Sequence, residues 1–437
     1  MPGNLQVQTM ELVHGLSTAI DLVSPSLVNH HRQVFGLSYK LAETLRLGDQ
    51  EMSDICIAAM LHDIGVVAFN QGVDTAFDDS SVNDHAEMGY RLMKRFKPFA
   101  AAAEIVRNHH RHASSVRETG YEQSVGSSII HLADQISARL DAGLCVLTQS
   151  ENIRNWVKNE KSGMFLPDVV EVFLQKSARE DFWLDICFDI MPQIGCCPFP
   201  HWNLGLDMQG LLDLSELFRM IIDFRSRHTA THSRSVAHIA EALAKAAGFS
   251  GNDCIKIHVA GNLHDLGKLA TPVSILDNPG SLSAVERTIV KAHPYHTHRI
   301  LKGISGLGDI CSWASFHHEC LDGSGYPFHL GEDKIPIGAR IIAVADVFTA
   351  LSESRYYRHG MKRGACLRVM QSYSSDRKLD PQLISLIDKH YDEFYDLHLS
   401  VQQEGVSEYK QMLNEAIPLM LQAVEQLDRS MEINADS

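Results

Sequence analysis

An internal repeat is the feature that most constrains how this 437-residue chain can fold. In each half, a first histidine is followed 32 positions later by a His-Asp pair. A single histidine comes next, then two adjacent histidines beginning 24 positions further on, and finally an aspartate in an apolar stretch. Such a match in the same order is typical of a tandem duplication. The matching positions are His30, His62, Asp63, His85, His109, His110 and Asp134 in the first half, and His232, His264, Asp265, His293, His317, His318 and Asp346 in the second.

Helical periodicity dominates both halves. Residues 236–247 place apolar side chains at three- and four-residue spacing and end at Gly248, as a helix with a glycine cap would. Alternating patterns typical of strands are scarce. The sequence therefore predicts an all-α fold of two tandem helical domains.

Two prolines interrupt the helical pattern between Cys196 and Trp202, which indicates a joint. We place an N-terminal domain at residues 1–200 and a C-terminal domain at residues 201–437. Residues 406–427 form an amphipathic tail with Pro418 inside it, which we interpret as a packing or dimerisation helix.

Composition narrows the classes of function. The formal net charge of −15 argues against binding to nucleic acid polymers. No apolar run approaches the roughly 20 residues that span a bilayer, and the N-terminus lacks the pattern of a secretory signal. Nine scattered cysteines without a CxxC pair favour reduced thiols in the cytoplasm. The 24 histidines, many in clusters, make metal binding the first hypothesis.

The repeated positions combine imidazole and carboxylate groups, which suits a centre with two metal ions. A carboxylate can bridge two cations, while neutral imidazoles complete each coordination shell without cancelling positive charge. A closed structural zinc site would more often use cysteine, and no cysteine occupies these positions. We therefore favour iron or manganese.

Three motifs of the second half resemble the signatures of the HD-GYP family. They are His264-Asp-Leu-Gly-Lys268, His317-His-Glu319 and Asp322-Gly-Ser-Gly-Tyr-Pro327, and the resemblance runs from about residue 219 to about residue 363. HD-GYP proteins are helical phosphohydrolases that open cyclic dinucleotides. The first half resembles only the broader HD superfamily, so the expected architecture is an HD domain followed by an HD-GYP domain.

The resemblance implies a role for each repeated residue of the second half. It implies that Asp265 bridges two ions, and that His232, His264, His293, His317, His318 and Asp346 complete the metal ligands. Some family members hold a third ion with a glutamate four residues before the first histidine. This chain has His228 there, so we expect two ions and leave open whether His228 binds metal.

The same resemblance implies residues that handle the substrate. Lys268 would stabilise charge developing on a phosphate, and would thus be catalytic together with Asp265. Gly325 shapes the loop that presents Tyr326, which could stack on or hydrogen-bond to the substrate. Arg355 and Arg358 match family positions that contact the second phosphate.

The first half keeps all seven ligand-type residues as a second candidate metal site but lacks the phosphate-handling parts. Val66 replaces the lysine, and residues 119–122 are the nearest remnant of the glycine-tyrosine loop. Three interpretations stay open: a second hydrolase with another substrate, a metal-dependent ligand sensor, or a structural relic.

The expected function is therefore hydrolysis of a cyclic dinucleotide to a linear 5′-phospho-dinucleotide. Tandem chains of this design resemble bacterial phosphodiesterases acting on 3′,3′-cyclic GMP-AMP, with the first half a candidate for removing the 5′-phosphate. One alternative is a cyclic di-GMP phosphodiesterase with a non-catalytic N-terminal sensor. Another, from a different class, is a nucleotide-sensing module without turnover. An HD nucleotidase or a (p)ppGpp-type hydrolase is a further alternative for the first half. Base specificity cannot be read from the motifs.

Overall fold

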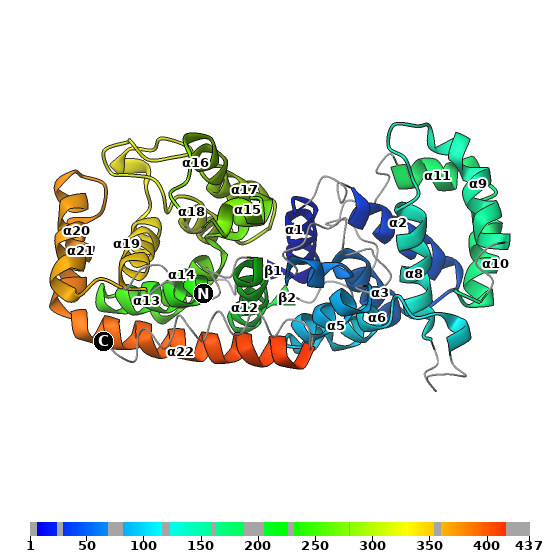
Figure 1. The fold of residues 1–437 in the computed structure, drawn as a ribbon, viewed down its shortest axis with the longest axis horizontal. Helices are drawn as coiled ribbons and strands as arrows, with labels where there is room; N and C mark the ends of the chain where they lie inside the picture. The colour runs from blue at the N-terminus through cyan, green and yellow to red at the C-terminus, as the bar shows by residue number, and fades with distance from the viewer. Residues whose placement is uncertain are drawn as a thin grey trace. The chain divides into compact units, whose positions relative to one another are not determined.

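The computed structural model describes residues 7–23, 29–68, 82–115, 123–159, 163–187, 205–225, 231–278, 280–353 and 360–416. Within these ranges the regular structure is helical, apart from a two-stranded sheet of β1 (Val7–Gln8) and β2 (Gly205–Leu206) (Figure 1). The predicted all-α fold is confirmed. No helix among the described residues is long and apolar enough to cross a membrane.

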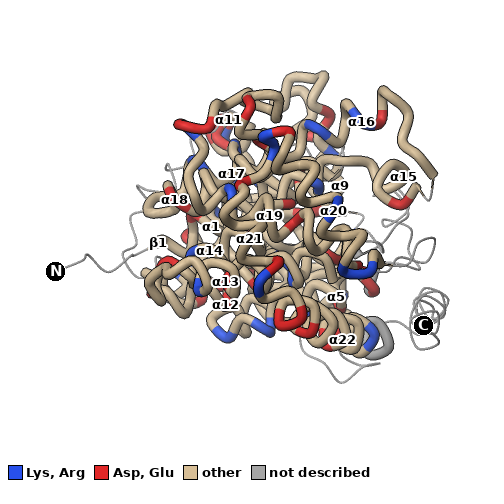
Figure 2. The backbone as a smooth tube through the Cα atoms, turned by 90° about the vertical axis from the view of Figure 1, so that its left-hand side faces the viewer, with Lys and Arg blue, Asp and Glu red and all other residues tan. Residues whose placement is uncertain are grey.

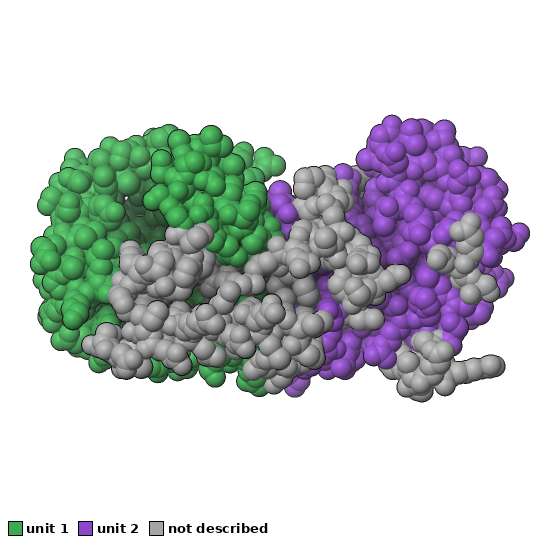
Figure 3. Space-filling model, in the orientation of Figure 1, with its two compact units in different colours: residues 1–7, 206–437 green, residues 8–205 purple. Residues whose placement is uncertain are grey.

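The chain divides into two compact units, residues 8–205 and residues 1–7 with 206–437 (Figure 3). The boundary that we predicted at residue 200 lies among residues 188–204, outside the described ranges, and stays a prediction. The main helical elements of the first unit are α1 (Thr9–Asp21), α2 (His30–Thr44), α3 (Asp49–Leu61), η2 (Ile64–Ala68), α5 (Val82–Met93), η3 (Lys97–Phe99), α6 (Ala100–Arg107), η4 (Ala113–Ser115), α8 (Val125–Ser137), α9 (Val146–Asn159), α10 (Pro167–Lys176) and α11 (Glu180–Cys187).

The main helical elements of the second unit are α12 (Met208–Arg225), α13 (His232–Ala246), α14 (Gly251–Leu263), η7 (Leu266–Ala270), α15 (Val273–Leu276), α16 (Ala284–Val290), α17 (His293–Leu301), α18 (Gly308–Ser315), η8 (Glu332–Lys334), α19 (Ile337–Ser352), α20 (Arg363–Ser375), α21 (Pro381–Lys389) and α22 (Tyr391–Ala416). The second unit repeats the order of α1, α2, α3 and η2 in α12, α13, α14 and η7, and α15 and α16 then precede α17.

The two units repeat the same packing. In the first, α2 packs against α3 and α8, and α5 packs against η2 and α6. In the second, α13 packs against α14 and α19, and α17 packs against η7 and α18. Equivalent positions in the two repeats therefore have equivalent neighbours. The internal repeat of the sequence is a repeat of structure.

Local sequence signals explain where helices of this repeat begin and end. The serine before α8, Ser124, accepts a hydrogen bond from Ser127 N, and Ser250 accepts one from Asp253 N before α14. At the end of α13, Gly248 has a φ of +85°. Gly248 N donates to Lys245 O, and Phe249 N donates to Ala244 O. This way of ending a helix favours glycine.

The tail helix α22 packs within its own unit. Val406, Tyr409 and Met412 are buried, and the ring of Tyr409 stacks on Phe224 of α12 with centroids 4.7 Å apart. Acidic positions recur along α22 (Figure 2), and one of them, Glu408, accepts hydrogen bonds from arginines of α12 and α13. The described part of the tail is thus a packing helix, whereas residues 417–427, with Pro418, lie outside the described ranges.

Candidate metal centres

Helix ends and the turns after them bring the repeated residues of the second unit together. His232 is the first residue of α13 and His293 the first residue of α17, while Asp346 lies inside α19. The pair His264 and Asp265 directly follows α14. The two adjacent histidines, His317 and His318, follow α18.

Asp265 lies between two groups of ligand-type atoms. Its Oδ2 is 3.2 Å from His264 Nε2, and its Oδ1 is 3.3 Å from His293 Nε2. The first group consists of His232, His264 and Asp346, and the second of His293, His317 and His318. Within each group the ligand atoms lie within 4.8 Å of one another. One carboxylate therefore faces both groups, as a bridging ligand must.

Backbone carbonyls fix how three of the imidazoles present their nitrogens. The Nδ1 atoms of His264, His293 and His317 each lie 2.7 Å from the carbonyl oxygen three residues earlier. A carbonyl only accepts, so each Nδ1 carries the proton and donates it. When a ring is neutral, its Nε2 therefore has the lone pair, and Nε2 faces the cluster as a metal ligand would.

Two of these lone pairs face each other. The Nε2 atoms of His293 and His317 are 3.3 Å apart, although both rings donate through Nδ1. Burial lowers the pKa of His293 to about 3 and that of His317 to about 4, so both rings are neutral at pH 7. Neither Nε2 can donate to the other, and a cation between them would satisfy both. The residues present thus fit a metal ion.

Other buried atoms of the cluster support the same conclusion. His264 Nε2 and Asp265 Oδ1 are buried and have no hydrogen-bond partner in the described part of the chain. Burial alone would raise the pKa of Asp265, but the charges of His264 and Lys268 hold it well below its usual value. The carboxylate is therefore ionised, as a metal ligand has to be.

The HD turn approaches α17 so closely that only glycine fits after it. A Cβ on Gly267 would lie 1.9 Å from the carbonyl oxygen of His293. The hydroxyl of Thr297 accepts from Gly267 N at 2.9 Å and donates to His264 O at 3.1 Å. Gly65 is equally close to His85 O, at 2.0 Å for a Cβ. This contact explains why a glycine follows the HD pair in both halves, and it makes Thr297 a positioning residue that the motifs did not reveal.

Lys268 lies between the buried carboxylate and solvent. Its Nζ donates to Asp265 Oδ2 at 2.6 Å, and its side chain is 20% exposed whereas that of Asp265 is 1% exposed. From the sequence we predicted that Lys268 stabilises charge on a phosphate. Its positive charge therefore lies at the edge of the metal-ligand cluster, and its contact with a phosphate stays a prediction.

The glycine-tyrosine loop lies beside His318 of the same cluster. A Cβ on Gly325 would lie 2.3 Å from Cys320 N, so this position requires glycine. The carboxylate of Glu319 clamps the loop by accepting from Phe328 N at 2.7 Å and Leu330 N at 2.8 Å. The ring of Tyr326 lies 4.9 Å from that of His318, between centroids. Gly325 thus shapes the loop, and Tyr326 is the residue that it presents beside a candidate ligand.

Three predicted residues cannot be placed. Arg355, Arg358 and His228 lie outside the described ranges, and their roles stay predictions.

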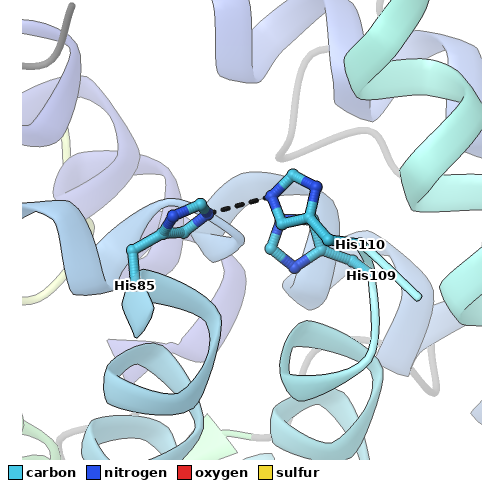
Figure 4. A group of neighbouring side chains, drawn as sticks. All are labelled: His85, His109 and His110. Atoms are coloured by element: carbon cyan, nitrogen blue, oxygen red, sulfur yellow. Dashed lines mark hydrogen bonds between the residues drawn. The ribbon is translucent and has the colours of Figure 1, made fainter. Parts of the chain in front are cut away.

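The first unit gathers its seven residues in the same way. His30 Nε2 is 3.3 Å from Asp134 Oδ1 and 3.2 Å from His62 Nε2. Asp63 again faces two sides, with Oδ2 at 3.3 Å from His62 Nε2 and Oδ1 at 3.5 Å from His85 Nε2. Figure 4 shows His85 of α5 and His110, in the turn after α6, pointing toward each other, with His109 beside them; the Nε2 atoms of His85 and His110 are 3.0 Å apart.

One further histidine of the first unit was missed by the sequence interpretation. His31 is fully buried, and its ligand atom lies within 4.8 Å of those of His62 and Asp63. The signal was the adjacent pair His30-His31, which the second half replaces with His232-Ser233.

Comparison with known proteins agrees with this geometry. Family models described as HD domain match residues 27–139 and 216–383. The chain contains two HD domains. The 3′3′-cGAMP-specific phosphodiesterase 1 of Vibrio cholerae is 26% identical over 402 residues, which cover 88% of this chain and 92% of that protein. A cyclic di-GMP phosphodiesterase response regulator of Xanthomonas campestris is 36% identical over 178 residues, 40% of this chain and 46% of that protein.

A solved structure has a similar fold over most of the chain. The crystal structure of a cyclic GMP-AMP specific phosphodiesterase of V. cholerae covers 89% of this chain and 98% of its own chain, with a TM-score of 0.62 and 23% identity. The two HD domains of the present chain therefore share their fold with that protein.

Proposed function

We propose that the second HD domain is a metal-dependent phosphodiesterase that opens a cyclic dinucleotide. Water adds to one phosphorus, the bond to the 3′ oxygen breaks, and the product is a linear dinucleotide with a 5′-phosphate and a free 3′-hydroxyl. The observation that carries this proposal is Asp265, whose two oxygens face two separate groups of ligand atoms, one of which includes His318 beside the ring of Tyr326. Similarity along most of the chain to a 3′3′-cGAMP-specific enzyme supports 3′,3′-cyclic GMP-AMP as the substrate.

Two divalent ions would be held by His232, His264 and Asp346 on one side and by His293, His317 and His318 on the other, with Asp265 shared. We propose iron or manganese, because mixed imidazole and carboxylate ligands suit these ions. When bound, such ions activate water and offset phosphoryl charge.

The chain itself supplies orientation and charge. The carbonyls that accept from Nδ1 hold the imidazoles in place, and Asp265 is kept ionised next to Lys268. Burial raises the pKa of Tyr326, so its hydroxyl stays protonated and can donate to a substrate oxygen. In the proposal, Lys268 adds positive charge where a phosphate oxygen becomes more negative, and Arg355 and Arg358 bind the second phosphate.

We propose a different role for the first HD domain, removal of the 5′-phosphate from the linear product. The supporting observation is that its candidate ligands are assembled, whereas Val66 stands where Lys268 stands in the second domain. A terminal phosphate needs no grip on a second, distant phosphate. One alternative is that the protein is a cyclic di-GMP phosphodiesterase whose first HD domain is a non-catalytic sensor. The other is that the protein senses nucleotides without turnover.

We extend the proposal to the setting of the protein. A cytoplasmic location is supported by free thiols at all described cysteines. The acidic net charge supports small anions at a metal site rather than nucleic acid polymers as ligands. The amphipathic pattern that continues beyond α22 supports a homodimer.

Lys268→Ala should lower the turnover number for ring opening by about a hundredfold, a typical effect of losing one charge-stabilising donor. The metal content should be unchanged, because Lys268 is no ligand. Steady-state kinetics with 3′,3′-cyclic GMP-AMP, together with metal analysis of the same preparation, checks both points. A change in KM alone would instead mark Lys268 as a group that binds substrate and transition state equally.

A further inference from the structure

His31 is a buried imidazole in the first HD domain that the proposed reaction does not use. It is the second residue of α2 and has no exposed surface. Its Nδ1 forms a hydrogen bond with a carboxylate oxygen of Asp21, the last residue of α1. Its Nε2 has no hydrogen-bond partner in the part of the chain that the structure describes. A buried nitrogen without a partner is costly unless something binds it.

The hydrogen bond to Asp21 determines what His31 Nε2 can bind. A carboxylate oxygen accepts this hydrogen bond, so Nδ1 of His31 carries a proton, and in the neutral ring this is the only proton on a ring nitrogen. Nε2 then carries a lone pair, and the pair Asp21–His31 has the arrangement in which a carboxylate orients a metal-binding imidazole.

The lone pair is directed toward two candidate ligands. His31 Nε2 is 4.0 Å from Asp63 Oδ2, and that oxygen is 3.3 Å from His62 Nε2. Two bonds of about 2.1 Å each to one ion can span up to about 4.2 Å. Asp63 Oδ2 is itself buried and has no hydrogen-bond partner among the described residues. Both separations therefore fit one cation shared by the three side chains.

The second HD domain shows what occupies the equivalent oxygen when this histidine is absent. There the position of His31 is Ser233, and Lys268 Nζ donates to Asp265 Oδ2 at 2.6 Å. In the first domain Val66 replaces the lysine and cannot supply positive charge. The second domain thus combines Ser233 with Lys268, and the first combines His31 with Val66.

From this exchange we propose that His31 is an additional ligand of a divalent cation that His62 and Asp63 hold in the first HD domain. The ion has one more protein ligand than its counterpart in the second domain, and hence one fewer position open to water or substrate. The proposal concerns metal binding alone and holds whichever phosphate ester the first domain acts on.

The test is made on the full chain with the second centre removed by His264→Ala and Asp265→Ala, so that bound metal reports on the first domain. Co²⁺ is the probe, because its visible absorption depends on the ligand set. Adding His31→Ser, which copies the second domain, should weaken Co²⁺ binding at least about tenfold and change the absorption spectrum. Adding Asp21→Asn should weaken it less, because the ligand is kept and only its orientation is lost.

The matched control is Ser233→Ala in a chain whose first centre is removed by His62→Ala and Asp63→Ala. Co²⁺ binding by the second domain should not change. Melting curves with and without Co²⁺ separate a ligand from a packing residue, since loss of a ligand reduces the metal-dependent gain in Tm. An unchanged Co²⁺ affinity and spectrum in the His31→Ser chain would overturn the proposal, even if the metal-free protein melted earlier. If His31→Ser does not fold, an unchanged affinity in Asp21→Asn overturns it instead.

Discussion

Asp265→Ala should reduce the opening of 3′,3′-cyclic GMP-AMP by several orders of magnitude. Its carboxylate is the group that faces both sets of ligand atoms in the second HD domain, with one oxygen 3.2 Å from His264 Nε2 and the other 3.3 Å from His293 Nε2. Without it, neither ion would keep its shared ligand, and activation of water would be lost. The measurement is the rate of linear product formation, with metal content determined in parallel.

A suitable control removes a carboxylate of the same unit that lies at the surface. Asp376 follows α20 and is exposed, so Asp376→Ala should leave both the rate and the metal content unchanged. If Asp265→Ala kept more than about a tenth of the wild-type rate, the dinuclear centre would be wrong. A loss of rate without loss of metal would assign Asp265 a role in the reaction other than bridging.

Removing the first centre should have an equally large but different effect. A chain with His62→Ala and Asp63→Ala should still open the ring, yet accumulate the linear dinucleotide with its 5′-phosphate. These residues belong to the first candidate centre, which has Val66 in place of the lysine. We propose that this centre acts on a terminal phosphate, which needs no grip on a second, distant phosphate. Chromatography of the products and an assay of inorganic phosphate give the measurement.

The reciprocal variant completes this prediction. A chain with His264→Ala and Asp265→Ala should spare the ring but remove phosphate from added linear product. Release of phosphate at the wild-type rate by the His62→Ala, Asp63→Ala chain would show that the first HD domain is no second enzyme. A sensor or a structural role would then be the better account of its ligands.

The sequence was sufficient to predict the helical repeat and which residues meet in each cluster. This was possible because the ligands sit at fixed places in a repeated helical unit, so equal spacing in sequence becomes equal position in space. His232 and His293, for example, both begin helices, and His264 directly follows one. A ligand set spread over five segments is visible in sequence when its copy stands in the same chain.

The features of the site that the sequence did not reveal depend on contacts in space that no sequence motif marks. The proton on Nδ1 of His264 is fixed by a backbone carbonyl, and Thr297 is linked to the cluster only through the fold. His31 was passed over because the sequence does not show its contact with Asp21, which lies ten positions away on another helix. Spacing between motifs cannot show which buried nitrogen lacks a partner.

The most direct test of the central claim is the product formed from cyclic dinucleotides by the metal-loaded, full-length protein. 3′,3′-cyclic GMP-AMP, cyclic di-GMP and cyclic di-AMP should be compared at equal concentration, each with wild type and with the His264→Ala, Asp265→Ala chain. The account predicts that wild type opens the cyclic GMP-AMP ring fastest and that the variant opens none. Faster opening of cyclic di-GMP would correct the substrate. Binding of all three without any linear product would contradict the claim that the second HD domain is an enzyme.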